Sequence, residues 1–327
     1  MYPLAFLRRE LASMSGRKKI GIVGGGNIGG ELARLFASRG MGDVWLLDIP
    51  AREKMVQGKA LDLEQNAALL GDDVFVRGTS DWAEFKGADI LIVTAGIPRK
   101  PGQSRDDLVL VNLPIIREIA QQARQHCPHA FTIVLSNPLD AMVYEYKRVT
   151  GFHRSQTLGM AGVLDSARFQ LFLAREANVS VKDIRALVLG GHGDDMVPVV
   201  SACTIQGIPV TRFIPEERLS SIIERTRKGG GEIVGLMGTS AYYAPASAAF
   251  TMAASYLLDQ KRVLCCAAYL EGEYGYRDLF MGVPVVIGKK GVEQIVTIPL
   301  TPQEEAMLAK SAKSVQSVLQ VVQQSHS

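Results

Sequence analysis

The chain has 327 residues, 47% of them hydrophobic and 21% charged, with a formal net charge of +3, a composition typical of a soluble globular protein of two domains. Its mild charge and dispersed basic residues exclude a nucleic-acid partner. The four cysteines, Cys127, Cys203, Cys265 and Cys266, form neither a disulfide framework nor a CxxC pair, which indicates buried thiols in a reducing compartment, the cytoplasm.

Residues 1–16 precede the first predicted strand. Their short apolar segment stands before Arg8 and Arg9, whereas a secretory signal carries a longer apolar region after its charge. A transit peptide is an alternative, but Glu10 and the short length argue against it. We therefore expect a disordered extension, and an upstream start codon before Met14 would explain it.

The stretch 18–48 combines four features in one unit. An apolar run at 20–23 predicts a buried strand, and GGGNIG at 24–29 fits G-x-G-x-x-G. Helical spacing follows at 31–38, and a second apolar run at 44–47 predicts another strand. Together these features predict a dinucleotide-binding unit, for which a glycine motif alone would be weak support.

The residue types of this unit have a chemical reason. Gly24 allows the tight turn, Gly26 lets the backbone approach a pyrophosphate, and Gly29 lets the helix pack closely on the strand. The helix N-terminus offers N–H groups to the phosphates. Asp48, at the end of the second strand, can accept hydrogen bonds from a ribose diol and repels a 2′-phosphate. The unit therefore favours NAD over NADP.

Helical and strand patterns alternate along the next hundred residues, which predicts βαβ units and a mostly parallel sheet. Ligands of such sheets bind beyond the carboxyl ends of the strands. The predicted helices lie at 57–69 and 107–126, the predicted strands at 73–78, 89–94 and 131–135, and a turn or helical piece at 81–86.

Two loops at that sheet edge carry polar residues. The loop 95–107 contains Arg99 and Arg105; most such loops are solvated surface segments, but two arginines over a cofactor site suggest a lid that closes on an anion. The loop after 135 places Asn137 at the same edge, where its amide can donate to and accept from a ligand.

The second half contains three further candidates. Asp165 and Arg168 are three positions apart, so they lie on one face of a predicted helix, where a plain ion pair is the simpler interpretation. His192 stands between glycines at the end of a predicted strand. The pair His126 and His129 lacks further ligands, so we expect no metal site.

An uncharged stretch at 233–258 is long enough to span a bilayer. Its glycines, its small residues and Pro245 argue against a span. They predict a helix at 246–258 that begins with Pro245 as its first residue and is buried between domains or subunits. We expect no membrane partner.

Seven segments make the chain resemble the lactate/malate dehydrogenase family, and within it the lactate-dehydrogenase-like branch of the malate dehydrogenases. They cover about residues 18–302 and read GIVGGGNIGG, LLDIPAREKMVQGKALDL, TAGIPRKPGQSRDDL, LSNPLDAM, GMAGVLDSARF, GGHGDDMVP and GTSAYYAPASA.

The resemblance implies an α/β fold, with a Rossmann doubly wound parallel sheet at 17–160 followed by an α+β substrate and catalytic domain at 161–327. It implies the reversible, NAD-dependent oxidation of (S)-malate to oxaloacetate by a homodimer or homotetramer. The residues that it implies for the cofactor are Gly24, Gly26, Asn27, Ile28, Gly29, Asp48, Asn112 and Asn137.

The resemblance also implies roles that agree with side-chain chemistry. His192 would exchange the hydroxyl proton, because imidazole titrates near neutrality, and Asp165 would fix its tautomer. Arg168 would bind the C1 carboxylate with a bidentate fork. In the lid, Arg105 would polarise the carbonyl oxygen and Arg99 would bind the distal carboxylate. Asn137 would help to orient substrate and nicotinamide.

Three other functions stay open. A lactate dehydrogenase carries an uncharged residue where this chain has Arg99. A non-catalytic NAD-binding protein would be expected to have lost one of His192, Asp165, Arg168 or Arg105, and all four are present. A glycosidase of the same fold would need a metal-binding Cys/His arrangement, which the sequence does not offer.

Overall fold

The structure is a computed structural model that describes residues 16–98 and 105–325. The predicted disorder of residues 1–16 therefore concerns a segment that, except for its last residue, lies outside the described residues. The first strands alternate with helices as predicted, and their bounds are β1 (Lys19–Val23), α2 (Asn27–Ala37), β2 (Asp43–Leu47), α3 (Glu53–Leu70), β3 (Val76–Thr79), β4 (Ile90–Val93), α4 (Arg105–His126), β5 (Phe131–Val134), α5 (Leu139–Thr150) and β6 (Thr157–Gly159).

These six strands pair in parallel in the order β3-β2-β1-β4-β5-β6, the doubly wound order of dinucleotide-binding domains. The prediction of a mostly parallel sheet with crossover helices is confirmed for this half of the chain. The predicted helical piece between β3 and β4 is a single turn at Trp82–Phe85.

The sheet continues beyond β6 through antiparallel strands from the second half of the chain. They are β12 (Arg262–Glu271), β13 (Arg277–Gly288) and β14 (Gly291–Ile295), and β12 pairs with β6 at Ala267 and Gly159. The two halves therefore share one nine-stranded sheet in the described part of the chain, which holds them together by backbone hydrogen bonds.

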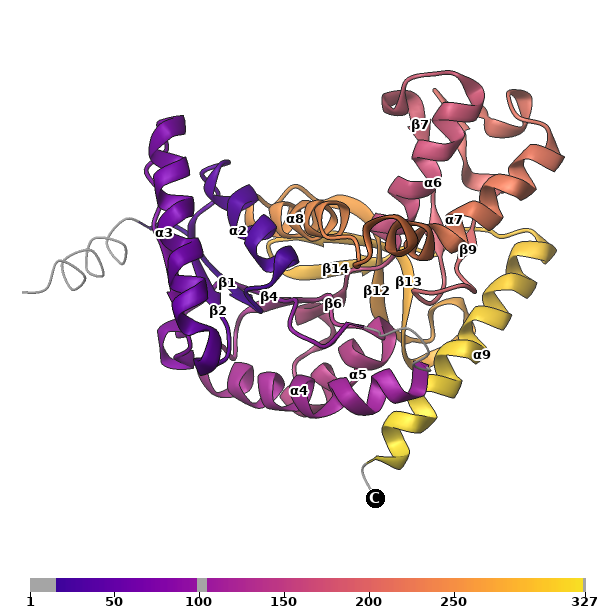
Figure 1. Cartoon of the computed structure of the whole chain (residues 1–327). Coiled ribbons are helices and arrows are strands. Elements are labelled where there is room, and N and C mark those ends of the chain that lie inside the picture. The colour runs from indigo at the N-terminus through magenta and orange to yellow at the C-terminus, as the bar shows by residue number, and fades with distance from the viewer. Residues whose placement is uncertain (1–15, 99–104, 326–327) are drawn as a thin grey trace, which may run out of the picture.

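Side chains of the central strands alternate between the two faces of the sheet, as strand geometry requires. On β4, Ile90 and Ile92 pack into the core between the sheet and α2. Leu91 and Val93 pack into the core between the sheet and the helices α4 and α5. Figure 1 shows this layering, with α2 and α8 (Tyr243–Leu257) above the sheet and α4 and α5 below it. All four residues are fully buried, because helices cover both faces.

The remaining elements form a lobe and a long C-terminal helix. The lobe holds α6 (Gly162–Ala177) and α7 (Glu216–Met237), with a third core around Phe169 and Leu173. Figure 1 shows it rising beside the main sheet, and α9 (Pro302–Gln324) passing from its base toward α4 and α5. The short strands of the lobe are β7 (Ile184–Arg185), β8 (Val188–Leu189), β9 (Val197–Pro198), β10 (Thr204–Ile205) and β11 (Ile208–Pro209).

The uncharged stretch at 233–258 is not one helix. It contains the end of α7, then Gly238 with a φ of +68°, and then α8. The predicted start of α8 is wrong by two residues: Pro245, the predicted first residue, is the third, where the missing N–H costs nothing because the first turn has no intrahelical partners. Within the described residues, no helix combines the length and apolar character needed to cross a bilayer.

The four cysteines are buried free thiols, as predicted. Burial raises the pKa of Cys127 to about 11 and that of Cys203 to about 12. Thiols with such pKa values are poor nucleophiles at neutral pH, so they serve as small apolar core residues.

Candidate active site

The centre of the site is a histidine held by a buried carboxylate. His192 lies in the glycine-rich loop after β8, and its Nδ1 is 2.8 Å from Oδ2 of Asp165 on α6. The Asp165 side chain is 2% exposed and that of His192 is 18% exposed. This hydrogen bond commits Nδ1, so Nε2 is the atom of the ring that can exchange a proton with a ligand.

The surroundings of His192 change its affinity for a proton. Burial alone lowers the pKa of the imidazole, but the charge and hydrogen bond of Asp165 and the charge of Asp140 outweigh burial and raise the pKa above its usual value. Arg168 opposes them weakly. Imidazole can both take and return a proton in one catalytic cycle, and these neighbours favour its protonated form.

Arg168 lies beside this pair, one helical turn after Asp165. Its Nη1 donates to Asp165 Oδ1 and to the carbonyl oxygen of Thr226 on α7, both at 3.3 Å. The side chain fits against α7 because residue 229 is glycine: a Cβ there would lie 2.4 Å from Arg168 Cδ. The predicted placement of Asp165 and Arg168 on one helix face is confirmed, whereas no sequence signal singled out Gly229.

Asp140, which the sequence did not single out, holds the histidine from the other half of the chain. It lies in the first turn of α5, and its Oδ2 accepts the backbone N–H of His192 at 2.9 Å. A small hollow adjoins this contact, lined by Asp140, His192 and residues of α9 such as Ser311. The sequence signal that could have identified Asp140 is its position, three residues after Asn137 at the sheet edge where ligands bind.

Asn112 and Asn137 are joined by a hydrogen bond. The buried Asn112 side chain accepts from Ile97 N (2.8 Å) and donates to the carbonyl oxygens of Ile97 (3.1 Å) and Asn137 (2.8 Å). Its amide therefore fastens the backbone that follows β4 to the backbone that follows β5. Direct contact of either side chain with the cofactor stays a prediction.

The glycine turn between β1 and α2 has the shape that a dinucleotide needs. Gly24 has a φ of +105°, and a Cβ there would lie 2.7 Å from Ala95 N. A Cβ on Gly29 would lie 1.9 Å from Gly24 O, so only glycine lets α2 start this close to β1. A Cβ on Gly26 would meet nothing within 4 Å, which leaves that side of the turn open for a ligand.

Three further predicted cofactor residues surround this turn. Asn27 is exposed and opens α2, whereas Ile28 is half-buried against the core. Asp48 follows β2, and its carboxylate accepts the N–H groups of Gly25 (3.0 Å) and Ile49 (2.9 Å). The glycines and Asp48 are thus together at the carboxyl edge of the sheet, as the spacing predicts, and the residues present fit a bound dinucleotide.

The two arginines of the predicted lid are not described. Arg99 lies outside the described residues, and α4 begins at Arg105, of which only the backbone is described. Across the described ranges, no group of three or more His, Cys, Asp or Glu side chains is placed to hold a metal ion.

Two family models match nearly the whole chain. The lactate/malate dehydrogenase NAD binding domain matches residues 18–159, and the lactate/malate dehydrogenase alpha/beta C-terminal domain matches residues 162–325.

Individual relatives and solved structures agree with these matches. The malate dehydrogenase of Sorangium cellulosum is 69% identical over 312 residues, covering 95% of this chain and all of the relative. That of Myxococcus xanthus is 51% identical, covering 95% and 99%. Among structures, Cryptosporidium parvum malate dehydrogenase superposes with a TM-score of 0.92 at 44% identity, covering 94% and 99%. The lactate dehydrogenase of the same organism, complexed with lactic acid and NAD, gives 0.91 at 40%, covering 94% and 98%.

Proposed function

The chain belongs to the lactate/malate dehydrogenase family, and we propose that it catalyses the reversible, NAD-dependent oxidation of (S)-malate to oxaloacetate. The observation that carries the reaction class is the His192–Asp165 pair beside Arg168. Relatives at up to 69% identity are malate dehydrogenases, which favours malate over lactate.

Bound NAD would supply the acceptor for the hydride that leaves C2 of the substrate. His192 removes the hydroxyl proton through Nε2, so that the C2–O bond becomes a carbonyl, and it returns the proton in the reverse direction. Asp165 keeps Nδ1 protonated and stabilises the imidazolium that forms. The remaining N–H groups of Arg168 bind the C1 carboxylate next to the base.

Selection of the substrate depends on the lid. By the match of its motif TAGIPRKPGQSRDDL to the family, Arg99 binds the distal carboxylate of oxaloacetate and Arg105 polarises the carbonyl oxygen. Pyruvate ends in a methyl group, and a closed site would leave Arg99 desolvated without a partner. Truncating one member of a buried charge pair costs about 2–5 kcal/mol, and a missing substrate carboxylate is comparable.

A comparison of oxaloacetate with pyruvate tests this function. At about 1.4 kcal/mol per tenfold, we expect kcat/KM for oxaloacetate to exceed that for pyruvate roughly 30- to several thousand-fold, measured by NADH oxidation. Arg99→Gln should lower activity on oxaloacetate sharply and raise activity on pyruvate modestly. A wild type that prefers pyruvate would show a lactate dehydrogenase, and an unchanged ratio in the variant would show that Arg99 does not select the substrate.

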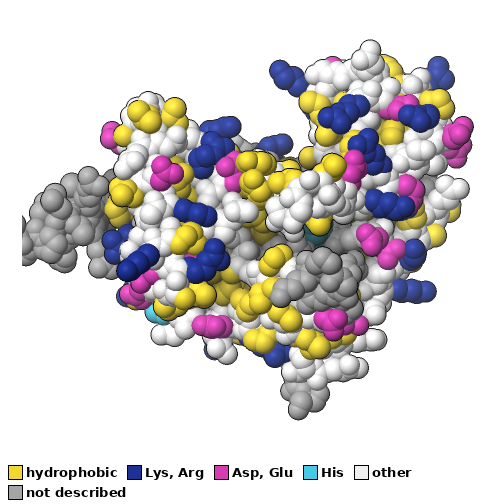
Figure 2. Space-filling model, in the orientation of Figure 1, with side chains coloured by type: hydrophobic (Ala, Val, Ile, Leu, Met, Phe, Trp, Pro, Cys, Tyr) yellow, Lys and Arg dark blue, Asp and Glu magenta, His cyan; other side chains and the backbone are white. Residues whose placement is uncertain are grey.

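We also propose a homo-oligomer, a dimer or a tetramer, in the cytoplasm. The buried free thiols support a reducing compartment. Exposed apolar side chains on α3 and around the junction of α7 and α8 support an interface between copies. Figure 2 shows apolar side chains gathered over α8 on one face of the molecule.

A further inference from the structure

A lysine from α3 contacts the carbonyl oxygens of the glycine turn between β1 and α2. Val56 and Ala60 form the buried stripe of α3, and the half-buried Lys59 stands beside them on the same side. Its Nζ donates to the carbonyl oxygens of Gly25 at 2.8 Å and Gly26 at 3.1 Å. One ammonium group therefore binds two successive peptide groups of the turn.

These contacts, together with the helical hydrogen bond from Gly30 N to Gly26 O at 3.0 Å, fix which way the turn's N–H groups point. In a planar trans peptide, the carbonyl and the N–H of the next residue point in opposite directions. Because the carbonyls of Gly25 and Gly26 point at Lys59, the N–H groups of Gly26 and Asn27 point away from it. The Cβ position of Gly26 faces open space, so a ligand can approach the turn there.

The position of Lys59 is unfavourable for a cation unless anions are near. Burial, and then the charge of Arg52, lower the pKa of the Lys59 ammonium, and Asp48 opposes them. Asp48 itself accepts the N–H of Gly25 at 3.0 Å. A pyrophosphate bound to the turn would bring further negative charge close to this ammonium.

We propose that Lys59 is a positioning residue for the pyrophosphate of the dinucleotide: it holds the peptide groups of the glycine turn in their binding orientation and places a positive charge behind them. The inference rests on NAD binding at this turn and does not depend on the choice between malate and lactate. It concerns a residue 30 positions after Gly29 that the glycine motif does not contain.

Binding of cofactor fragments tests the proposal without any turnover. Lys59→Met keeps the apolar stem of the side chain but removes the ammonium. In this variant we expect the Kd of ADP-ribose, measured by calorimetry, to rise roughly tenfold or more, which is a loss of at least about 1.4 kcal/mol of binding free energy. The Kd of adenosine, which has no phosphate, should stay within about twofold. Lys59→Arg should restore most of the ADP-ribose affinity.

Lys54→Met on the exposed side of the same helix is the control for loss of one positive charge, and it should leave both affinities unchanged. If Lys59→Met does not fold, Lys59→Gln keeps a donor without the charge and should still weaken ADP-ribose selectively. Unchanged ADP-ribose binding in Lys59→Met, or in Lys59→Gln where that variant replaces it, would overturn the proposal. An equal loss for ADP-ribose and adenosine would also overturn it, because that pattern means general damage to the domain.

Discussion

The proton chemistry of the site depends on the charges that face His192. Asp165 and Arg168 come from α6 and Asp140 from α5. The histidine's own loop carries Asp194, which is exposed, and Asp195, whose Oδ1 is 2.7 Å from Nζ of Lys310 on α9. Asp140 accepts the backbone N–H of His192, whereas Asp165 binds the ring, so Asp140 can lose its charge while the Asp165 hydrogen bond stays.

We predict that Asp140→Asn moves the pH profile in a defined direction. Asparagine can still accept the N–H of His192 but carries no charge, so the pKa of the imidazole should fall. Oxaloacetate reduction needs protonated His192 and is lost as pH rises through that pKa, so its alkaline limb should move to lower pH. Malate oxidation needs the neutral ring, so its acid limb should move the same way.

The measurement is kcat/KM against pH in both directions, with kcat at the optimum staying within about threefold of wild type. Asp194→Asn, in the same loop but exposed, is the matched control and should shift the profile less. A profile for Asp140→Asn that coincides with wild type would show that Asp140 has only a structural role.

The sequence predicted the helices, strands and turns that depend on residues close together in the chain. The G-x-G-x-x-G turn, the strand spacing and the three-residue step from Asp165 to Arg168 each depend on neighbours in sequence. The start of α8 does not, because its N-cap, Tyr242, makes no side-chain cap and so leaves no sequence signal. Lys59 and Gly229 were missed for a related reason: each is defined by a contact with a different element.

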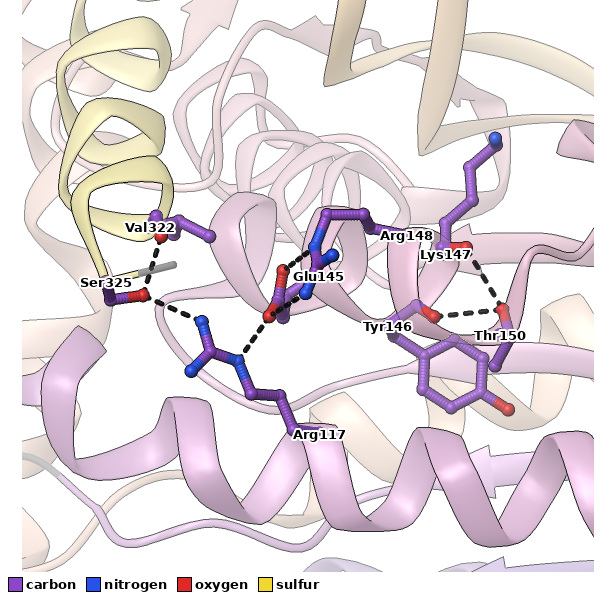
Figure 3. A network of polar contacts seen from close by, with 8 residues as sticks. All are labelled: Arg117, Glu145, Tyr146, Lys147, Arg148, Thr150, Val322 and Ser325. Carbon is purple, nitrogen blue, oxygen red and sulfur yellow. Dashed lines mark hydrogen bonds and ion pairs between the residues drawn. The ribbon is translucent and has the colours of Figure 1, made fainter. Parts of the chain in front are cut away.

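A buried carboxylate and its arginine partner connect three helices from both halves of the chain. Glu145 on α5 is fully buried, accepts from Arg117 on α4, and accepts from Arg148 at 2.7 and 3.0 Å. Arg117 Nη2 donates in turn to Ser325 Oγ at 2.7 Å, just after the end of α9. Figure 3 shows Arg117 between Glu145 and Ser325, so the end of α9 is tied to α4 and α5.

We predict that Glu145→Ala destabilises the protein without changing its chemistry. Removing one partner of a buried ion pair costs about 3–5 kcal/mol. The arginine side chains are 28% and 45% exposed and can regain water, so we expect about 2–3 kcal/mol, seen as a lower urea midpoint. Glu118→Ala, exposed on α4, should change stability by less than about 0.5 kcal/mol. Equal midpoints for the two variants would contradict this.

At the scale of the whole molecule, the site is assembled from both halves of the chain. His192 and Asp140 are 52 positions apart, and no periodicity predicts which loop meets which helix. The family resemblance supplied the residues that react, because those stand in motifs. It also supplied Asp165, which holds the ring of His192. It gave no role to Asp140, although that residue stands in the segment LSNPLDAM, because its contact with His192 forms only when the two halves share one sheet.

Several large apolar side chains are exposed on the surface of the chain. Leu69 on α3 is 87% exposed and Leu236 near the end of α7 is 82% exposed, and further exposed apolar residues, Leu61, Leu70, Met237 and Tyr243, accompany them. Monomeric proteins seldom expose apolar side chains in such groups. We therefore expect light scattering to give a mass of two or four times 35.5 kDa.

Charged substitutions locate the interface. Leu236→Glu places a charge where apolar contact is expected, so it should shift the mass toward that of one chain and lower the melting temperature, because association stabilises the folded state. Val181→Glu, at a residue that is 45% exposed and follows α6, is the matched control and should leave the mass unchanged. A wild type with the mass of one chain would refute the homo-oligomer. An oligomer that persists in Leu236→Glu would place the interface elsewhere.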